Sequence, residues 1–295
     1  MHITVIGQSG QLARALTERA GAHGVTLTSY ARADCDLSQP AKVIEDFISA
    51  LDTQAVIIAA AYTAVDAAET DYETALAVNG AAPSAIARAC AKKDIPLVHV
   101  STDYVFSGQA STPYQPQDKT DPVNAYGRSK LAGEQGVLAA HERAAILRTS
   151  WVFDGSGKNF LTTMLRLGAE REALSIVADQ IGRPSYAEHL AEACLKAAKA
   201  LSQSEFTDYS GIFHVSGTGE PISWADFARE IFAATEAARP HKINVTPIPS
   251  SDYPTPAKRP LYSVLDTARF ETVFGALPHW KAGLKDAVTR WGAAS

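Results

Sequence analysis

The stretch "VIGQSGQLA", residues 5–13, decides the fold of this chain. It follows the strand-like run "ITVI" (3–6) and leads into a segment whose apolar residues have helical spacing. The small residues Gly7, Gly10 and Ala13 would let backbone N–H groups approach a pyrophosphate, and the N-terminus of the following helix would favour its negative charge. We therefore predict that this turn binds a nucleotide, rather than serving only as a structural turn.

Strand-like runs and helical patterns alternate outward from this turn through the first half of the chain. Further strands are expected at 25–28, 55–60, 96–101 and 144–150, and helices at 12–24, 41–51, 83–94 and 129–141. Repeated strand–helix–strand units predict a parallel sheet with helices on both faces, and strands that are apolar throughout fit burial on both sides. We expect residues 1–150 to form an α/β, Rossmann-type, doubly wound parallel sheet that binds NAD(P).

The second half is less regular. Helical patterns are expected at 160–171, 186–202, 223–236 and near 282–291, strands near 174–178 and 212–216, and a Pro-rich passage follows at 246–260. No linker-like segment separates the two halves. We therefore expect residues 151–295 to form a smaller, interleaved α/β part that is mainly substrate-binding, packs on the first part and lines a shared cleft, with later segments returning to the sheet.

Composition narrows the class of protein. Lys and Arg number 27 against 32 Asp and Glu, for a net charge of −5, and no basic block stands out, so nucleic acid is disfavoured as a partner. No apolar run reaches membrane-spanning length, which predicts no membrane partner. The three cysteines, Cys35, Cys90 and Cys194, are far apart, which favours a reducing cytoplasm over a disulfide framework or a zinc site.

The end of the second predicted strand, "LTSYARADCD" (27–36), bears on the choice of cofactor. An acidic residue there would hold the ribose 2′-OH of NAD, and an arginine would suit the 2′-phosphate of NADP. Arg32 therefore favours NADPH, while Asp34 and Asp36 leave NADH open as an accepted alternative. An ordinary solvated surface charge is the other interpretation of Arg32.

Tyr126 and Lys130, in "NAYGRSKLAGE" (124–134), are the main catalytic candidates. Residues four apart share one face of a helix, and an ammonium nearby would lower the tyrosine pKa from its usual value of about 10. The pair alone is common by chance, as a surface tyrosine and a surface lysine. However, Ser101 and Thr102 end the fourth predicted strand, where open α/β sheets place catalytic groups. We therefore predict a catalytic set of Thr102, Tyr126 and Lys130.

Several longer motifs carry a resemblance to a known family. They are "GQSGQLA" (7–13), "AAAYTAVDAAE" (59–69), "VNGAAPSAIARAC" (78–90), "STDYVFSG" (101–108), "NAYGRSKLAGE" (124–134), "LRTSWVFDGSGKNF" (147–160), "VADQIGRPSYAEHLA" (177–191) and "KRPLYSVLDTARF" (258–270). The chain resembles the extended short-chain dehydrogenases/reductases and, most closely and nearly end to end, the dTDP-4-dehydrorhamnose reductase family. This resemblance implies NADPH-dependent reduction of the 4-keto group of dTDP-4-dehydro-β-L-rhamnose to dTDP-β-L-rhamnose.

The resemblance also implies residue roles. Thr102 would hydrogen-bond the 4-keto oxygen, Tyr126 would protonate it, and Lys130 would hold the nicotinamide ribose and lower the Tyr126 pKa. With Arg32, the cofactor-binding set is Gly7, Gly10, Gln11, Leu12, Asp36, Leu37, Ala59, Ala60, Ala61, Tyr62, Tyr126 and Lys130. The substrate-binding set is Thr63, Val65, Thr102, Asp103, Tyr126, Trp151 and Arg259. Within it, Arg259 would meet the nucleotide phosphates, and Trp151 would stack on the deoxysugar or nucleotide or else be a core residue.

Other functions stay open. A related nucleotide-sugar enzyme, such as a 4-epimerase, a 4,6-dehydratase or another 4-ketodeoxysugar reductase, is the first alternative. A dehydratase would need an acid–base pair, and Asp103 has no neighbouring glutamate in the sequence. A non-catalytic, NADP-binding regulatory subunit is the second alternative.

Three further expectations concern metals, subunits and unused motifs. Some members of the family are paired through Mg²⁺ between acidic residues, of which Glu188 alone is expected here, so we predict no required metal and a monomer or homodimer. "GSGKN" (155–159) lacks the spacing of a phosphate-binding loop. His99, inside an apolar strand, is expected to be a satisfied core residue.

Overall fold

The computed structural model describes residues 1–236 and 241–294. Its centre is a six-stranded, all-parallel sheet in the order β10-β5-β4-β3-β1-β2. The strands are β1 (His2–Ile6), β2 (Thr26–Tyr30), β3 (Val56–Ile58), β4 (Leu97–Thr102), β5 (Ala144–Thr149) and β10 (Gly211–His214). The strand order reverses between β1 and β3, and such switch points open a ligand crevice at the carboxyl ends of the strands. The predicted doubly wound sheet is confirmed.

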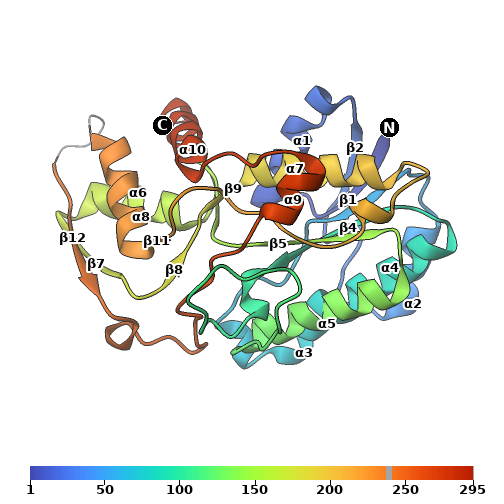
Figure 1. The fold of residues 1–295 in the computed structure, drawn as a ribbon, viewed down its shortest axis with the longest axis horizontal. Coiled ribbons are helices and arrows are strands. Elements are labelled where there is room, and N and C mark those ends of the chain that lie inside the picture. The colour runs from blue at the N-terminus through green and yellow to red at the C-terminus, as the bar shows by residue number, and fades with distance from the viewer. Residues whose placement is uncertain (237–240, 295) are drawn as a thin grey trace.

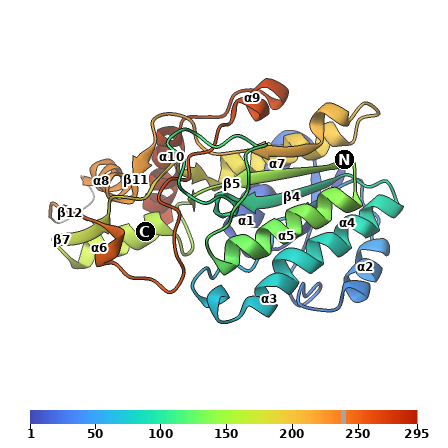
Figure 2. The ribbon, with the colours of Figure 1, turned by 60° about the horizontal axis from the view of Figure 1, so that its bottom comes forward.

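Helices cover both faces of this sheet (Figure 1). One face packs on α1 (Gln11–Arg19) and α7 (Ala187–Leu201), and the other on α2 (Ala41–Ser49), α4 (Ala82–Lys92) and α5 (Ala125–Ala140). Alternate residues of β1 divide between the two cores: Val5 packs with the α1 and α7 side chains, and Ile6 with those of α2 and α4. Figure 2 shows α2, α4 and α5 side by side across the second face.

The smaller part contains α6 (Phe160–Glu170), α8 (Trp224–Ala234) and α10 (Trp280–Ala294). Its described strands pair in twos: β7 (Ala173–Val177) with β12 (Asn244–Ile248), β8 (Ile181–Gly182) with β11 (Ile222–Ser223), and β6 (Val152–Phe153) with β9 (Ser185–Tyr186). A separate apolar core around Phe153, Phe227 and Trp280 holds these elements together. The predicted helices and the two predicted strands of the second half are confirmed.

Two elements that follow residue 151 belong to the central sheet and not to the smaller part. Strand β10 pairs with β5, and helix α7 packs against α1. The chain therefore crosses between the two parts more than once, and Figure 1 shows α7 lying over the sheet. The division into residues 1–150 and 151–295 stays a prediction.

Three local features differ from the sequence expectations. Helix α1 ends at Arg19 and not at 24, because a short 3-10 turn and Gly24, at φ +64°, stop it. The segment before α4 contains a short helix, α3 (Tyr72–Leu76), and one π-helical turn, Ala77–Ala81. The Pro-rich passage begins inside β12, where Pro247 is tolerated because this strand pairs with a single neighbour.

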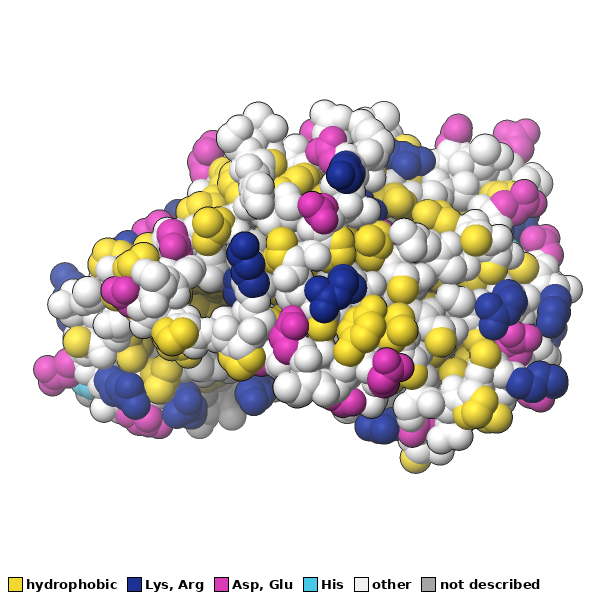
Figure 3. Space-filling model, turned by 90° about the horizontal axis from the view of Figure 1, so that it is seen from below, with side chains coloured by type: hydrophobic (Ala, Val, Ile, Leu, Met, Phe, Trp, Pro, Cys, Tyr) yellow, Lys and Arg dark blue, Asp and Glu magenta, His cyan; other side chains and the backbone are white. Residues whose placement is uncertain are grey.

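The surface shows mixed charge on the face seen in Figure 3, where basic and acidic side chains are interspersed. Ion pairs join charged side chains of neighbouring helices, such as Arg88 of α4 with Glu45 of α2. No helix among residues 1–236 and 241–294 has the length and apolar character needed to cross a bilayer.

Helix α5 and the π-helical turn approach each other closely near the cleft. A Cβ atom added at Gly133 of α5 would lie 2.1 Å from the backbone oxygen of Asn79. The Asn79 side chain is buried, accepts a hydrogen bond from the Tyr62 N–H, and donates to the Tyr62 carbonyl and to Ser129 Oγ. This one residue therefore ties the loop after β3 to helix α5.

We expect Gly133→Ala to lower the free energy of unfolding by about 2–4 kcal/mol, because the added methyl group meets backbone that cannot yield. Gly292→Ala in α10 is the matched control, since nothing lies within 4 Å of its added Cβ. That control should change stability by no more than about 1 kcal/mol, through helix propensity alone. Urea unfolding measures both, and equal effects would contradict the close approach described above.

Candidate active site

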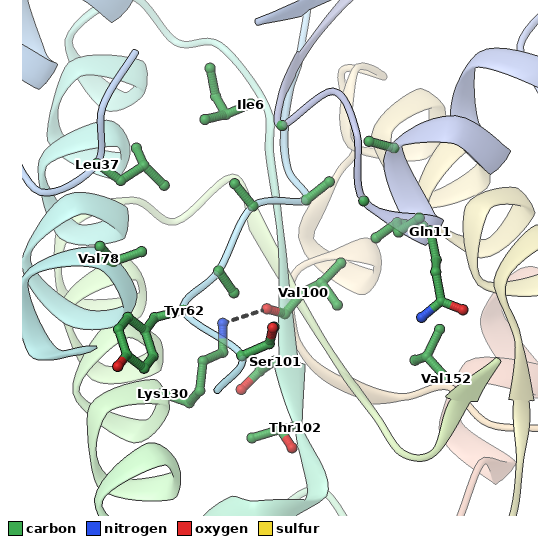
Figure 4. Close-up of a pocket in the computed structure, with 18 of the residues that line it drawn as sticks. Ile6, Gln11, Leu37, Tyr62, Val78, Val100, Ser101, Thr102, Lys130 and Val152 are labelled. Atoms are coloured by element: carbon green, nitrogen blue, oxygen red, sulfur yellow. Dashed lines mark hydrogen bonds between the residues drawn. The ribbon is translucent and has the colours of Figure 1, made fainter. Parts of the chain in front are cut away.

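A cleft of about 1040 Å³ opens at the carboxyl ends of β1, β3, β4 and β5, between the two parts of the chain. Figure 4 shows side chains entering it from opposite walls, with Tyr62 and Lys130 on one side and Gln11 and Val152 on the other. All the predicted site residues line this cleft except Val65 and Arg259. Its volume is that of a site for a large organic ligand.

The glycine turn has the shape of an anion cradle. Gly7 has φ +120°, and an added Cβ there would lie 3.0 Å from the Ala60 nitrogen, so the position requires glycine. Gly10 begins α1 without a side-chain cap, and the first turn carries no acidic residue. Gln11 Oε1 is buried and has no hydrogen-bond partner among the described residues. These observations fit a dinucleotide whose pyrophosphate would lie at the N-terminus of α1.

Arg32 and Asp36 lie where β2 leads into the cleft. Both Asp36 oxygens are engaged, because Oδ1 accepts hydrogen bonds from Ser38 and Oδ2 lies 3.3 Å from Arg32 Nε. The Ser38 backbone N–H is the main reason that the pKa of Asp36 is lowered. The Arg32 side chain is 79% exposed, so its guanidinium is open to an incoming phosphate.

Thr102 ends β4 and is buried at the floor of the cleft. Its Oγ1 accepts a hydrogen bond from the Tyr104 N–H at 3.2 Å and donates one to Asp103 Oδ1 at 3.0 Å. Burial raises the pKa of Asp103 to about 7, and the Ser263 and Thr102 hydroxyls offset this only in part. The acidic residue beside Thr102 therefore titrates close to neutral pH.

Tyr126 lies in the first turn of α5, which is well anchored. Asn124 caps the helix, accepting from the Gly127 N–H at 2.8 Å, and Glu69 accepts from the Ala125 N–H at 2.8 Å. The Tyr126 ring meets Tyr104 edge to face at 5.7 Å. The helix start thus fixes where the phenol enters the cleft.

Lys130 is buried one turn further along α5. Its Nζ donates to the Val100 carbonyl at 2.8 Å, as the dashed line in Figure 4 shows. Burial lowers the pKa of Lys130 to about 8, against the raising effect of Glu134. Burial raises the pKa of Tyr126 to about 12, although the Thr102 hydroxyl lowers it somewhat. The expected lowering by Lys130 is not seen in this arrangement, where the ammonium is directed at β4.

Trp151 stands in a rare conformation, with φ +50°. Its indole is stacked on Trp224 with ring centroids 3.5 Å apart and an interplanar angle of 8°. A Cβ added at Gly182 would lie 2.6 Å from the same indole. Trp151 is therefore already stacked on protein, and its predicted stacking on a sugar or nucleotide stays a prediction.

Arg259 lies outside the cleft lining, in a bidentate ion pair with Asp66 at 2.7 and 2.8 Å. Asp66 also accepts from the Ala257 N–H at 3.1 Å. Val65, beside Asp66, is likewise outside the lining. Contact between Arg259 and nucleotide phosphates stays a prediction.

Sequence reasoning missed several residues of the site. Trp224 and Lys158 line the cleft, and Asn79 supports it from behind. Lys158 belongs to "GSGKN" (155–159), the loop that leads into α6. Its last residue, Asn159, is the N-cap of that helix. Asn79 lies in a quoted motif, but only the π-helical turn reveals its role. Nothing in the sequence near Trp224 signals that it faces Trp151.

Glu188, the acidic residue singled out for a metal, is engaged in ion pairs with Arg290 and Arg19. Helix α1 also supplies Glu18, which the sequence reading missed and which shares Arg290 with Glu188. No group of three or more His, Cys, Asp or Glu side chains in the described part of the chain could hold a metal ion. The absence of a required metal stays a prediction.

Comparison with known proteins agrees with this geometry. The family model of the RmlD substrate binding domain matches residues 1–292. The dTDP-4-dehydrorhamnose reductase of Sinorhizobium fredii is 40% identical over 289 residues, covering 98% of this chain and 97% of that protein.

Two solved structures are similar over nearly their full length. The crystal structure of a dTDP-4-dehydrorhamnose reductase from Clostridium acetobutylicum has a TM-score of 0.91 and 34% identity, covering 99% of this chain and 100% of that one. The Bacillus anthracis dTDP-4-dehydrorhamnose reductase in complex with NADP has a TM-score of 0.87 and 33% identity, covering 100% and 99%. From the family model and the relatives together, this chain belongs to the RmlD family of dTDP-4-dehydrorhamnose reductases.

Proposed function

We propose that this chain uses NADPH to reduce the 4-keto group of dTDP-4-dehydro-β-L-rhamnose to dTDP-β-L-rhamnose, the last step of dTDP-L-rhamnose biosynthesis. One observation carries the proposal: Thr102, Tyr126 and Lys130 meet in the cleft that also contains the glycine turn of β1. Family membership and the NADP complex of the Bacillus anthracis relative support it.

The chain's own residues define where a cofactor would be held. The backbone of Gly7 and Gly10 would receive the pyrophosphate, Arg32 the 2′-phosphate, and Lys130 the nicotinamide ribose. When bound, NADPH supplies the hydride for the reduction. The small residues Ala59, Ala60 and Ala61 leave room along the β3 wall for the middle of a dinucleotide.

Tyr126 is the proton donor in this proposal. Because its pKa is raised to about 12, the phenol is protonated at neutral pH and ready to protonate the sugar O4 as negative charge develops there. The charged Lys130 would favour the resulting phenolate. Thr102 would donate a second hydrogen bond to O4 by turning its hydroxyl from Asp103. Two donors directed at O4 would stabilise the negative charge that develops there.

The rival functions differ in what they require. A 4,6-dehydratase would need a second carboxylate beside Asp103, and the residue that follows Asp103 is Tyr104. An epimerase would retain NAD⁺ between turnovers. A regulatory subunit would not need the buried Lys130 or the anchored Tyr126.

We also propose a cytoplasmic location and a monomeric or homodimeric state. Cys35, Cys90 and Cys194 are buried free thiols, which supports a reducing compartment. The substrate partner is a small nucleotide sugar.

The direct test follows NADPH oxidation at 340 nm with dTDP-4-dehydro-6-deoxyglucose, with and without a 3,5-epimerase. We expect turnover only when the epimerase supplies the rhamno-configured ketone. Turnover without the epimerase would assign a different 4-ketodeoxysugar reductase. Binding of NADPH with no turnover in either case would favour the regulatory subunit, and NAD⁺ that copurifies with the protein would favour an epimerase or dehydratase.

We expect Tyr126→Phe to reduce kcat by at least about 10³-fold, because the general acid is removed while the ring is retained. The dissociation constant of NADPH, measured by fluorescence, should change by less than about threefold. Tyr72→Phe in α3, which also removes one phenolic hydroxyl, is the matched control and should retain activity. A large loss of NADPH affinity in Tyr126→Phe would contradict the role assigned to this residue.

A further inference from the structure

His99 lies behind the wall of the cleft, in the middle of β4, and is fully buried. Alternation along the strand places it on the same face as Leu97, which packs against α4 and α5. Its Nε2 lies 3.4 Å from Lys130 Nζ. Its Nδ1 is buried and has no hydrogen-bond partner among the described residues. His99 is therefore buried as expected, but it is not a satisfied core histidine.

The direction of the contact follows from chemistry. An ammonium group has donors only, so His99 Nε2 accepts the hydrogen bond and the ring proton resides on Nδ1. Burial and the charge of Lys130 hold the pKa of His99 well below its usual range, so the imidazole is neutral and able to accept. A buried N–H without a partner is unfavourable, and an apolar side chain at this position would avoid it.

The contact determines how the three N–H groups of Lys130 are used. One donates to the Val100 carbonyl at 2.8 Å and a second to His99 Nε2 at 3.4 Å. Both acceptors belong to β4, so the ammonium is held at the cleft wall from one side. The third N–H remains for the cleft, which Lys130 itself lines.

Other charged groups surround Lys130 without replacing His99. Glu134 on α5 raises the Lys130 pKa, but its two oxygens are occupied by Arg148 of β5 at 2.9 and 2.6 Å. Tyr126 on α5 carries a phenol that is neutral at physiological pH. Lys130 has two acceptors on β4, the Val100 carbonyl and His99 Nε2. Only the histidine can be removed by substitution, because the carbonyl belongs to the backbone.

We propose that His99 is a positioning residue for the reduction: by accepting a hydrogen bond from Lys130, it holds the ammonium against β4 in its charged form with one N–H directed into the cleft. This inference rests on the proposed function, because it assigns Lys130 the task of holding the cofactor ribose and favouring the Tyr126 phenolate. His99 itself touches neither the cleft nor the reacting atoms.

The proposal predicts the direction in which the pH dependence of kcat/KM should change when His99 is replaced. A hydrogen bond to the charged form of a group favours that form, so loss of the His99 acceptor lowers the Lys130 pKa further below about 8. Lys130 then loses its proton at lower pH, and the alkaline limb of kcat/KM moves down by about one pH unit. Asp103, whose pKa burial raises to about 7, takes no part in the His99–Lys130 contact and should titrate as before.

The test compares His99→Met with His99→Gln between pH 6 and 10. Methionine fills the space without a strong acceptor, whereas the glutamine Oε1 can reach the position of Nε2. We expect the methionine variant to show the shifted alkaline limb and about tenfold weaker NADPH binding at pH 8.5. The glutamine variant should return the alkaline limb to its position in the unaltered chain. Its NADPH dissociation constant should lie within about twofold of that of the unaltered chain.

His214→Met is the matched control. His214 is also fully buried, and its Nδ1 contacts the Tyr114 carbonyl. It lies on β10, which β5 separates from the β4 strand of His99. This variant should lose stability without moving the alkaline limb. If His99→Met does not fold, His99→Asn takes its place, because asparagine puts its acceptor near Nδ1 and leaves Lys130 without one.

Two outcomes would overturn the proposal: an alkaline limb in the Met or Asn variant that coincides with that of the unaltered chain, or equal behaviour of the Gln and Met variants. The NADPH-binding arm does not depend on turnover. If the unaltered chain binds NADPH but reduces no sugar, the proposed function fails, while the His99 contact is still judged by the pH dependence of binding.

Discussion

The site depends on how closely helix α5 lies against the π-helical turn of residues 77–81. At Gly133 the Asn79 backbone oxygen occupies the place that any side chain would take. The Asn79 side chain then holds Tyr62 on the loop after β3 and Ser129 on α5. The loop after β3 and helix α5 are thereby held in one register, and Tyr126 and Lys130 come to lie beside the end of β4.

A buried layer of charge supports the same helix. Lys130, Glu134 and Arg148 follow one another through the core, and Glu134 and Arg148 are each only 2% exposed in their side chains. A buried ion pair is tolerated when its remaining donors are satisfied, and Arg148 also donates to the Pro116 carbonyl and lies over the Phe106 ring. The negative charge of Glu134 raises the pKa of Lys130, whose own burial lowers it. The lysine can therefore be both buried and charged near neutral pH.

Most of the sheet could be predicted from the sequence, because strands buried on both faces read as apolar runs and Gly7 and Gly10 mark the first turn. The meeting of Thr102, Tyr126 and Lys130 in one cleft could also be predicted, since Tyr126 and Lys130 share a helix face and Thr102 ends a strand. The remainder depends on contacts between distant segments. No local pattern pairs Trp151 with Trp224 or Arg259 with Asp66, and the π-helical turn inserts a residue that helical spacing does not reveal. His99 looked like core because only the folded chain brings Lys130 to its ring.

The central claim is that this one cleft brings a hydride donor and the sugar C4 together at Thr102, Tyr126 and Lys130. It is tested most directly with NADPH deuterated at one of the two C4 positions, each isomer used separately, and with the 3,5-epimerase present. The account predicts that one isomer transfers a single deuterium to C4 of the sugar product, as seen by NMR, and that the other transfers none. Product formed without deuterium at C4 from either isomer would contradict direct transfer within this cleft.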